Sequence, residues 1–116
     1  MAVESDEEVL WEGRPFLSIT QHYTVTNDRV RVQRGFFGRS TDNVELTRLQ
    51  DVDVTQHVGE RMVNIGDITM YGANKSDPVV VLENVHDPEQ VQEIIRRAML
   101  AARKRHGVRI REDLVQ

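Results

Sequence analysis

Cysteine is absent from the 116 residues, and long apolar runs are missing too. The first absence excludes disulfides, cysteine-ligated zinc and thiol catalysis, and it suits a reducing compartment. The longest apolar runs, 79–82 and 98–102, fall far short of the roughly 20 residues of a membrane-spanning helix. The first eight residues carry four acids, whereas a signal peptide begins with basic residues. These features predict a cytoplasmic protein, either free or peripheral to the membrane.

Catalytic and cofactor motifs are missing as well. The four histidines, at 22, 57, 86 and 106, have no paired metal-binding spacing, and no nucleophile elbow or glycine-rich nucleotide loop occurs. The nearest to a metal site is the pair Asp51 and Asp53, which share one face of a predicted strand, with His57 on that face if the strand continues. A solvated polar face explains the same residues more simply. We therefore expect no enzyme, no cofactor and no metal, and keep a metal-dependent enzyme as the weakest alternative.

Charge is divided unevenly along the chain, although the net charge is only -4. Residues 1–95 hold 17 acidic and 8 basic side chains, a net charge of -9, whereas residues 96–111 hold seven basic side chains and no acid. A basic block of this kind often contacts an acidic surface. Nucleic acid is an unfavoured partner, because the body is acidic and only 5% of the residues are aromatic. An anionic membrane, a protein partner and the acidic body of a second copy remain.

Apolar side chains alternate with polar ones through much of residues 17–82, which predicts several half-buried strands. We expect strands at 17–25, 29–33, 42–46, 51–55, 65–71 and 79–82. Asn27 and Asp28 predict a hairpin turn because both tolerate left-handed backbone. Gly59 and Glu60 predict another turn. The single tryptophan, Trp11, is expected to anchor the core.

After residue 87 the apolar period changes to that of a helix, and one face is expected to carry Val91, Ile94, Ile95, Ala98 and Ala102. Asp87 before Pro88 is a helix-start pattern, and Gly107 after three basic residues is a helix-stop pattern. We therefore expect a helix at about 88–106. The predicted organisation is an acidic flexible segment at 1–8, one domain at 9–106, and a tail or short extra strand at 107–116.

Six short motifs resemble, in order, those of the bacterial pleckstrin-homology (PH)-like domain family, also called the membrane-flanked domain family. They cover about residues 8 to 105 and lie at 8–15, 23–29, 34–39, 49–52, 65–70 and 82–91. The resemblance implies a mostly β fold with one C-terminal α-helix, in which a bent antiparallel barrel, or two orthogonal sheets, is capped by the helix. It also implies a non-catalytic binding or scaffolding domain that forms homo-oligomers. Many relatives lie beside transmembrane helices, whereas no such helix is expected here. The chain therefore resembles a free-standing soluble member of the family.

Two sets of residues are candidates for contacts. Phe36 and Phe37 are adjacent at a glycine-rich bend, so one of them is expected to be exposed as an oligomer or partner contact unless the bend buries both. Arg34 and Arg39 flank them. The alternative function is an anionic-membrane or anionic-ligand surface on the helix, formed by Arg96, Arg97, Arg103, Lys104 and Arg105.

Both candidate sets have simpler explanations. The helix basics also fit a solubilising outer face that complements the helix dipole. The basic second strand and bend also fit cross-strand pairing with acids such as Asp42 or Glu45. Eukaryotic PH domains that bind phosphoinositides use basic residues in the first hairpin loop. Here that loop, residues 26–29, is nearly neutral, so we recognise no inositol-phosphate site.

Overall fold

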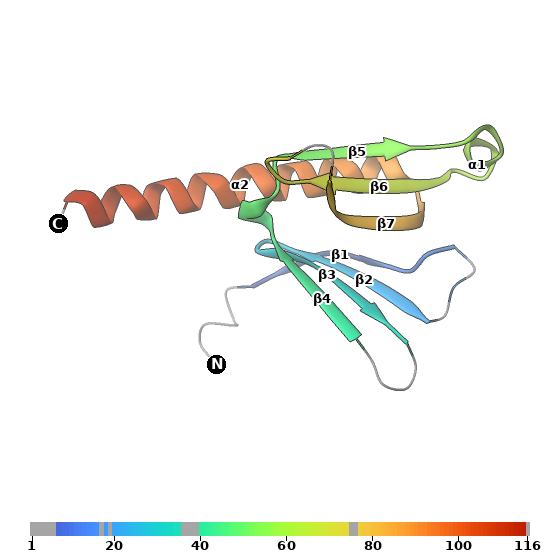
Figure 1. Ribbon diagram of the computed structural model, residues 1–116, viewed down its shortest axis with the longest axis horizontal. Helices are drawn as coiled ribbons and strands as arrows, with labels where there is room; N and C mark the ends of the chain where they lie inside the picture. The colour runs from blue at the N-terminus through green and yellow to red at the C-terminus, as the bar shows by residue number, and fades with distance from the viewer. Residues whose placement is uncertain (1–6, 17, 19, 36–39, 75–76, 116) are drawn as a thin grey trace.

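A computed structural model describes residues 7–16, 18, 20–35, 40–74 and 77–115, and side chains as far as Gly107. Two antiparallel sheets lie one above the other, and a long C-terminal helix runs beside them (Figure 1). This architecture confirms the expected fold class. The first sheet has the order β1-β2-β3-β4 and the second the order β5-β6-β7. The strands are β1 (Val9–Gly13), β2 (Gln21–Thr26), β3 (Arg29–Arg34), β4 (Ser40–Glu45), β5 (Asp51–Thr55), β6 (Ile65–Tyr71) and β7 (Pro78–His86).

The β2–β3 hairpin forms where alternation predicts it, but its turn differs from the expected one. Neither Asn27 nor Asp28 has left-handed backbone. Instead, the buried Thr26 hydroxyl accepts hydrogen bonds from the N–H groups of Asp28, at 3.1 Å, and Arg29, at 3.0 Å. A threonine hydroxyl can replace a backbone acceptor in this way. Two residues of the predicted first strand, Leu17 and Ile19, lie outside the described residues.

In the second sheet, a short helix and a bulge modify the predicted pattern. Helix α1 (Val58–Met62) occupies the place of the turn expected at Gly59 and Glu60. The register between β6 and β7 shifts between Gly66 and Ile68, as the glycine within that strand indicates. A 3₁₀ turn, Leu46–Arg48, connects the two sheets.

The core lies between the sheets and one face of helix α2 (Pro88–Val115). Val30 and Val32 enter it from the first sheet, and Ile68 and Leu82 from the second. Of the predicted helix stripe, Val91, Ile95, Ala98 and Ala102 are buried and Ile94 is partly buried. Met99, which was not predicted, is buried as well. Trp11 is only partly buried and packs against this core. In β2, β3, β6 and α2 the apolar pattern of the sequence thus corresponds closely to the buried face of the element.

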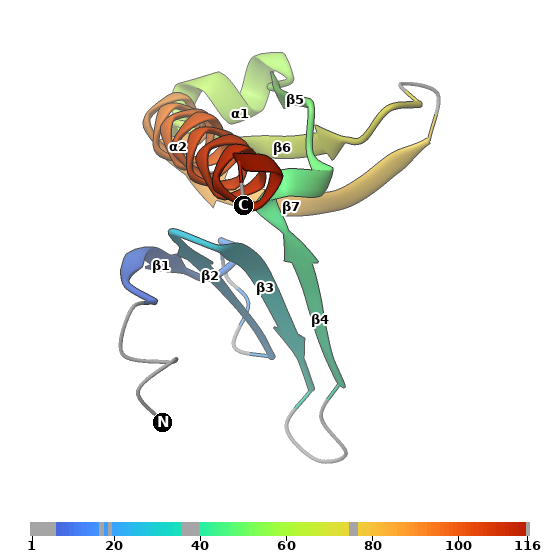
Figure 2. The ribbon, with the colours of Figure 1, turned by 90° about the vertical axis from the view of Figure 1, so that its left-hand side faces the viewer.

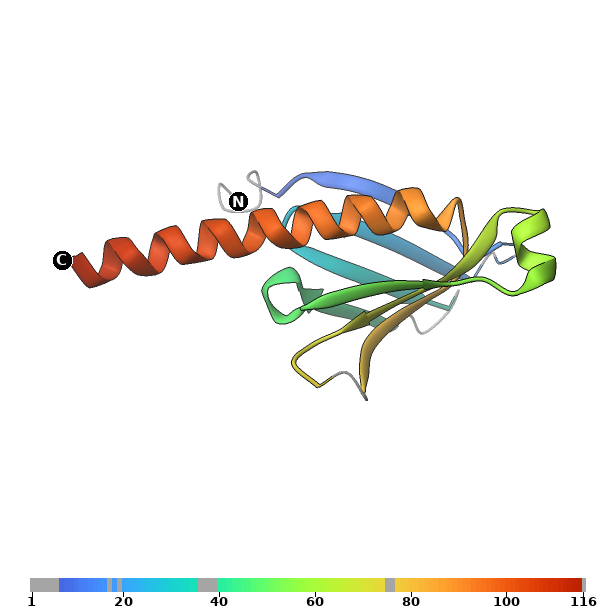
Figure 3. The same cartoon turned by 90° about the horizontal axis from the view of Figure 1, so that it is seen from above.

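Helix α2 is longer than predicted, and residues 107–115 form neither a tail nor a strand. It runs to Val115 and includes Gly107, whose φ is not left-handed. Its last turns extend past the sheets (Figure 3). A glycine can terminate a helix, but within one it only costs about 1 kcal/mol relative to alanine. At the other end, Asp87 has left-handed backbone, with a φ of 52°, and its N–H donates to the carbonyl of Asn64.

Candidate interaction surfaces

The basic side chains of the β3–β4 hairpin pair with acids of the same sheet. Arg34 Nη1 lies 2.7 Å from Asp42 Oδ2, and Arg29 Nε lies 3.6 Å from Glu45 Oε2. Arg31 Nε donates to Asn43 Oδ1 at 3.0 Å. The cross-strand pairing anticipated for this strand is therefore present. The other three predicted contact residues of the bend, Phe36, Phe37 and Arg39, lie outside the described residues.

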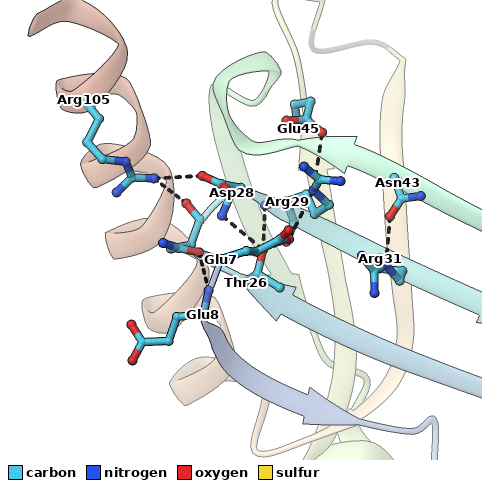
Figure 4. Close-up of polar contacts among 10 residues, drawn as sticks. Glu7, Glu8, Thr26, Asp28, Arg29, Arg31, Asn43, Glu45 and Arg105 are labelled. Atoms are coloured by element: carbon cyan, nitrogen blue, oxygen red, sulfur yellow. Dashed lines mark hydrogen bonds and ion pairs between the residues drawn. The ribbon is translucent and has the colours of Figure 1, made fainter. Parts of the chain in front are cut away.

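Residues Glu7 and Glu8 are bound to the β2–β3 hairpin, although the sequence predicted a flexible segment there (Figure 4). Glu7 Oε2 accepts the Thr26 hydroxyl at 2.8 Å and lies 3.2 Å from Arg29 Nε. The N–H of Glu8 donates to Asn27 Oδ1 at 2.8 Å. The Glu7 carboxylate therefore pairs with the hairpin, and Glu8 binds it through backbone groups.

The five basic residues proposed on the helix do not form one surface. Arg103 Nη2 donates to the carbonyl of Leu49 at 2.5 Å. Arg105 Nη2 donates to the carbonyl of Asn27 at 2.6 Å and lies 3.3 Å from Asp28 Oδ1 (Figure 4). These two guanidinium groups therefore attach the helix to the body.

The other three basic residues of the set remain directed to solvent. Arg97 pairs with Glu93 one turn earlier, with 2.9 Å between Nε and Oε2. Arg96 and Lys104 are exposed and have no hydrogen bond or ion pair to a described residue. Of the five, Arg97 and Arg105 therefore have an acidic partner, Arg103 is held by a neutral carbonyl, and Arg96 and Lys104 have no described partner.

Each sheet has two outer strands, and an outer strand exposes N–H and C=O groups that can pair with another chain. The edge at β5 is covered by helix α2. Gln92 Nε2 donates to the carbonyl of Val52 at 2.7 Å, and the N–H of Val52 donates to Asp51 Oδ1 at 2.9 Å. These contacts occupy the N–H and C=O groups of Val52, and the bond from Arg103 occupies the carbonyl of Leu49 just before the strand.

The edge at β7 is partly covered by contacts with the first sheet and with the segment before β2. The N–H of Glu83 donates to the Tyr23 hydroxyl at 3.1 Å, and the carbonyl of Asn84 accepts from the N–H of Phe16 at 2.7 Å. Pro78, at the start of the strand, has no N–H to offer. Two register shifts also interrupt the pairing of β7 with β6. These contacts bind Glu83 to the first sheet and Asn84 to the segment before β2, whereas residues 79–82 make no backbone hydrogen bond to a described residue outside β6.

The two outer strands of the first sheet differ from each other. Strand β1 has a register shift between Val9 and Trp11 and packs beside α2. Strand β4 stays in register with β3 over six consecutive pairs, from Arg34↔Ser40 to Arg29↔Glu45. Its backbone makes no hydrogen bond to a described residue outside β3, and its first four side chains are exposed. Strand β4 lies at the outer side of its sheet, leaning away from β7 (Figure 2). Among the described strands, β4 is therefore the outer strand with the most regular pairing and no backbone hydrogen bond on its outer side, which borders an open groove whose other wall includes Gly72 and Asp77.

Two open grooves can be described from the residues whose placement is given. One lies between β4 and the segment before β7, and its wall includes Asp42, Arg48 and Asp77. The other lies between β1 and the start of α2, and its wall includes Trp11 and His86. Across the described residues, no group of three or more His, Cys, Asp or Glu side chains could hold a metal ion.

The acidic strand site does not assemble. Strand β5 ends at Thr55, so His57 leaves the face that Asp51 and Asp53 share. The N–H of His57 instead donates to Glu60 Oε1 at 2.9 Å, at the start of α1. Because local hydrogen bonding at a helix start outweighs continued strand pairing, the predicted alignment of the three residues is lost.

Sequence reasoning missed one exposed apolar group, on and after α1. Val58 and Met62 are 82% and 85% exposed, and the next residue, Val63, is 52% exposed. The pattern Val-Gly-Glu-Arg-Met was interpreted as a turn because of its glycine. Only the short helix shows that both apolar side chains project from the body.

Comparison with known proteins identifies the class. The chain belongs to the bacterial PH domain family, whose sequence profile matches residues 9–99. The fold is also similar to the crystal structure of a DUF1696 family protein with a pleckstrin-homology domain from Shewanella loihica PV-4. That similarity has a TM-score of 0.61 at 18% sequence identity, and it covers 81% of this chain and 80% of the other. The chain matches none of the curated proteins. Among the described residues, no helix is long and apolar enough to cross a membrane.

Proposed function

We propose that this chain is a non-catalytic PH-like binding and scaffolding domain that self-associates. One observation carries the proposal: strand β4 is a regular six-residue edge without the coverings found at β5 and β7. A strand edge of this kind pairs readily with another chain, so proteins usually cover or interrupt it. The edge also follows directly after the bend at residues 34–39, where Phe36, Phe37, Arg34 and Arg39 were our candidate contacts.

The charges near this edge support a protein partner rather than a charged ligand. Asp42 pairs with Arg34, and Glu45 shares Arg29 with Glu7. Both carboxylates of the strand therefore already have a cationic neighbour, and the strand offers backbone hydrogen bonds and small polar side chains beside them. Desolvating such a strand costs less than desolvating unpaired carboxylates.

Mass measurement by light scattering tests the proposal. At tens of micromolar we expect a mass of at least two chains, falling toward one chain on dilution. A strictly monomeric protein over this range would refute self-association.

Binding to an anionic membrane is the second candidate function. It rests on Arg96 and Lys104, the two exposed basic residues of the helix without a described partner. Each such residue contributes about 1 kcal/mol near an anionic surface, so two residues give weak binding. Flotation with vesicles that contain phosphatidylserine tests it. Salt-sensitive flotation that is lost in the double variant Arg96→Ala, Lys104→Ala would favour the membrane, and no flotation would eliminate it.

A further inference from the structure

The exposed β4 edge has features that specify how a second copy would bind, and this inference rests on the self-association proposed above. We propose that two chains join their β4 strands in antiparallel pairing around a two-fold axis, with the axis passing between the two copies of Asn43. The two four-stranded sheets would then form one continuous eight-stranded sheet. The pairing buries the uncovered N–H and C=O groups of β4 against identical groups.

Geometry restricts where the axis can lie. Residues directly opposite each other in an antiparallel pair point to the same face, and a two-fold axis perpendicular to the sheet preserves the faces. The axis therefore passes between two copies of one residue. An axis at Asp42 or at Asn43 pairs five strand residues from each chain, whereas an axis nearer either end pairs fewer. The choice is between these two registers.

Charge decides between the two registers. An axis at Asp42 would place two carboxylates directly opposite each other, which is destabilising. An axis at Asn43 instead places Asp42 opposite Val44, and Thr41 opposite Glu45. The threonine hydroxyl can then donate to the glutamate carboxylate. No like charges face each other in this register.

The Asn43 side chain is already oriented for this pairing. Arg31 Nε donates to Asn43 Oδ1 at 3.0 Å, which directs the Nδ2 group of the amide away from the strand's own sheet (Figure 4). This Nδ2 group has no hydrogen-bond partner among the described residues. Across the axis, each Nδ2 group would meet the Oδ1 atom of the other copy. Arg31 and Asn43 of both chains would then form one row of hydrogen bonds over the new seam.

Single-cysteine variants test the register directly, because the natural sequence contains no cysteine. Residues opposite each other in an antiparallel pair have Cα atoms about 4.5 to 5.5 Å apart, within the range that a disulfide spans. Under mild oxidation we expect Asn43→Cys to give mostly cross-linked dimer on a non-reducing gel. Thr41→Cys should give little cross-linked dimer, since the two thiols introduced at position 41 would lie roughly 13 Å apart along the strands. Asp42→Cys should also give little, because each position 42 lies opposite Val44 of the other copy. Thr47 is exposed in the 3₁₀ turn. The variant Thr47→Cys therefore serves as the control for cross-linking by random collision.

A second measurement does not depend on oxidation. Asn43→Lys places two ammonium groups opposite each other, so we expect the dimer dissociation constant to rise about fivefold or more. Thr47→Lys adds the same charge away from the seam and should leave the constant unchanged. Both constants come from light scattering over a dilution series.

The outcomes separate this inference from the proposal on which it rests. A self-associating protein whose Asn43→Cys variant does not cross-link above the Thr47→Cys level, or which cross-links best at position 42, would overturn the β4 interface and leave self-association standing. An unchanged dissociation constant for Asn43→Lys would do the same. A wild-type protein that is monomeric at tens of micromolar would overturn both.

Discussion

The Tyr23 hydroxyl connects the two sheets, and removing it should destabilise the fold by a predictable amount. Tyr23 is buried in β2, and its hydroxyl accepts the N–H of Glu83 in β7 and donates to Gln21 Oε1 at 3.0 Å. Tyr23→Phe preserves the ring but leaves the Glu83 N–H without its acceptor. An unsatisfied buried group costs about 1 to 3 kcal/mol, and the lower half applies because Glu83 lies near the surface.

For a domain of this size, 1 kcal/mol corresponds to about 4 °C in Tm. We therefore expect Tyr23→Phe to lower Tm by about 4 to 8 °C, measured by thermal denaturation followed by circular dichroism. Tyr71→Phe is the matched control, because the Tyr71 hydroxyl makes no hydrogen bond to a described residue. Equal Tm changes in the two variants would refute a connecting role for the Tyr23 hydroxyl.

The same residue predicts a dependence on pH. Burial raises the pKa of the Tyr23 phenol above its ordinary value, although the hydrogen bond with the Glu83 backbone acts in the opposite direction. Below about pH 10 the folded and unfolded states both keep the proton. Above it the unfolded state releases the proton first, so the contribution of Tyr23 to stability is lost as the pH rises through the folded pKa. The Tm advantage of the wild type over Tyr23→Phe should therefore shrink above about pH 10, and a constant difference would contradict the raised pKa.

Four further predictions concern glycines and metal ions. Gly66→Ala should lower stability by about 1 to 3 kcal/mol in chemical denaturation, because its Cβ would lie 2.6 Å from Gln56 Cγ and 2.9 Å from the Thr55 carbonyl. Gly59→Ala, with nothing within 4 Å of its Cβ, should be neutral or slightly stabilising. Gly107→Ala should raise helicity in far-UV circular dichroism and stabilise α2 by about 1 kcal/mol, whereas a loss of helicity would indicate a left-handed stop at this position. Millimolar Mg²⁺, Ca²⁺ or Zn²⁺ should leave Tm unchanged, and a clear rise would revive a metal site.

Strands β2 to β7 and the start of the helix were predictable because local periodicity records which face of each element is buried, whereas β1, whose residues do not alternate, was not predicted. Val30 and Val32 alternate with arginines, and Val91, Ile95 and Ala98 recur at helical spacing. These patterns arise from the geometry of one element at a time, so no tertiary information is needed to interpret them.

The end of α2 and the α1 segment were mispredicted because glycine is ambiguous in sequence. Gly107 can take left-handed backbone at a helix stop or remain helical within a longer helix, and its neighbours allow both. Gly59 was likewise interpreted as a turn, although it lies inside α1. The backbone conformation of a glycine depends on contacts that its own sequence does not contain.

The candidate surfaces were likewise predictable from the sequence only in part. The sequence alone established that the body is acidic and that the helix end is basic. It also established that the residues on both sides of Asn27 and Asp28 form a pair of strands. Only the tertiary structure decided that Arg103 and Arg105 bind carbonyls of their own body, that Gln92 covers β5, and that β4 is left uncovered. These outcomes depend on which distant segments meet when the two sheets and the helix pack together. Charge and periodicity specify which face of a segment is buried. Whether the edge of a strand is covered depends instead on the distant segments that pack beside it.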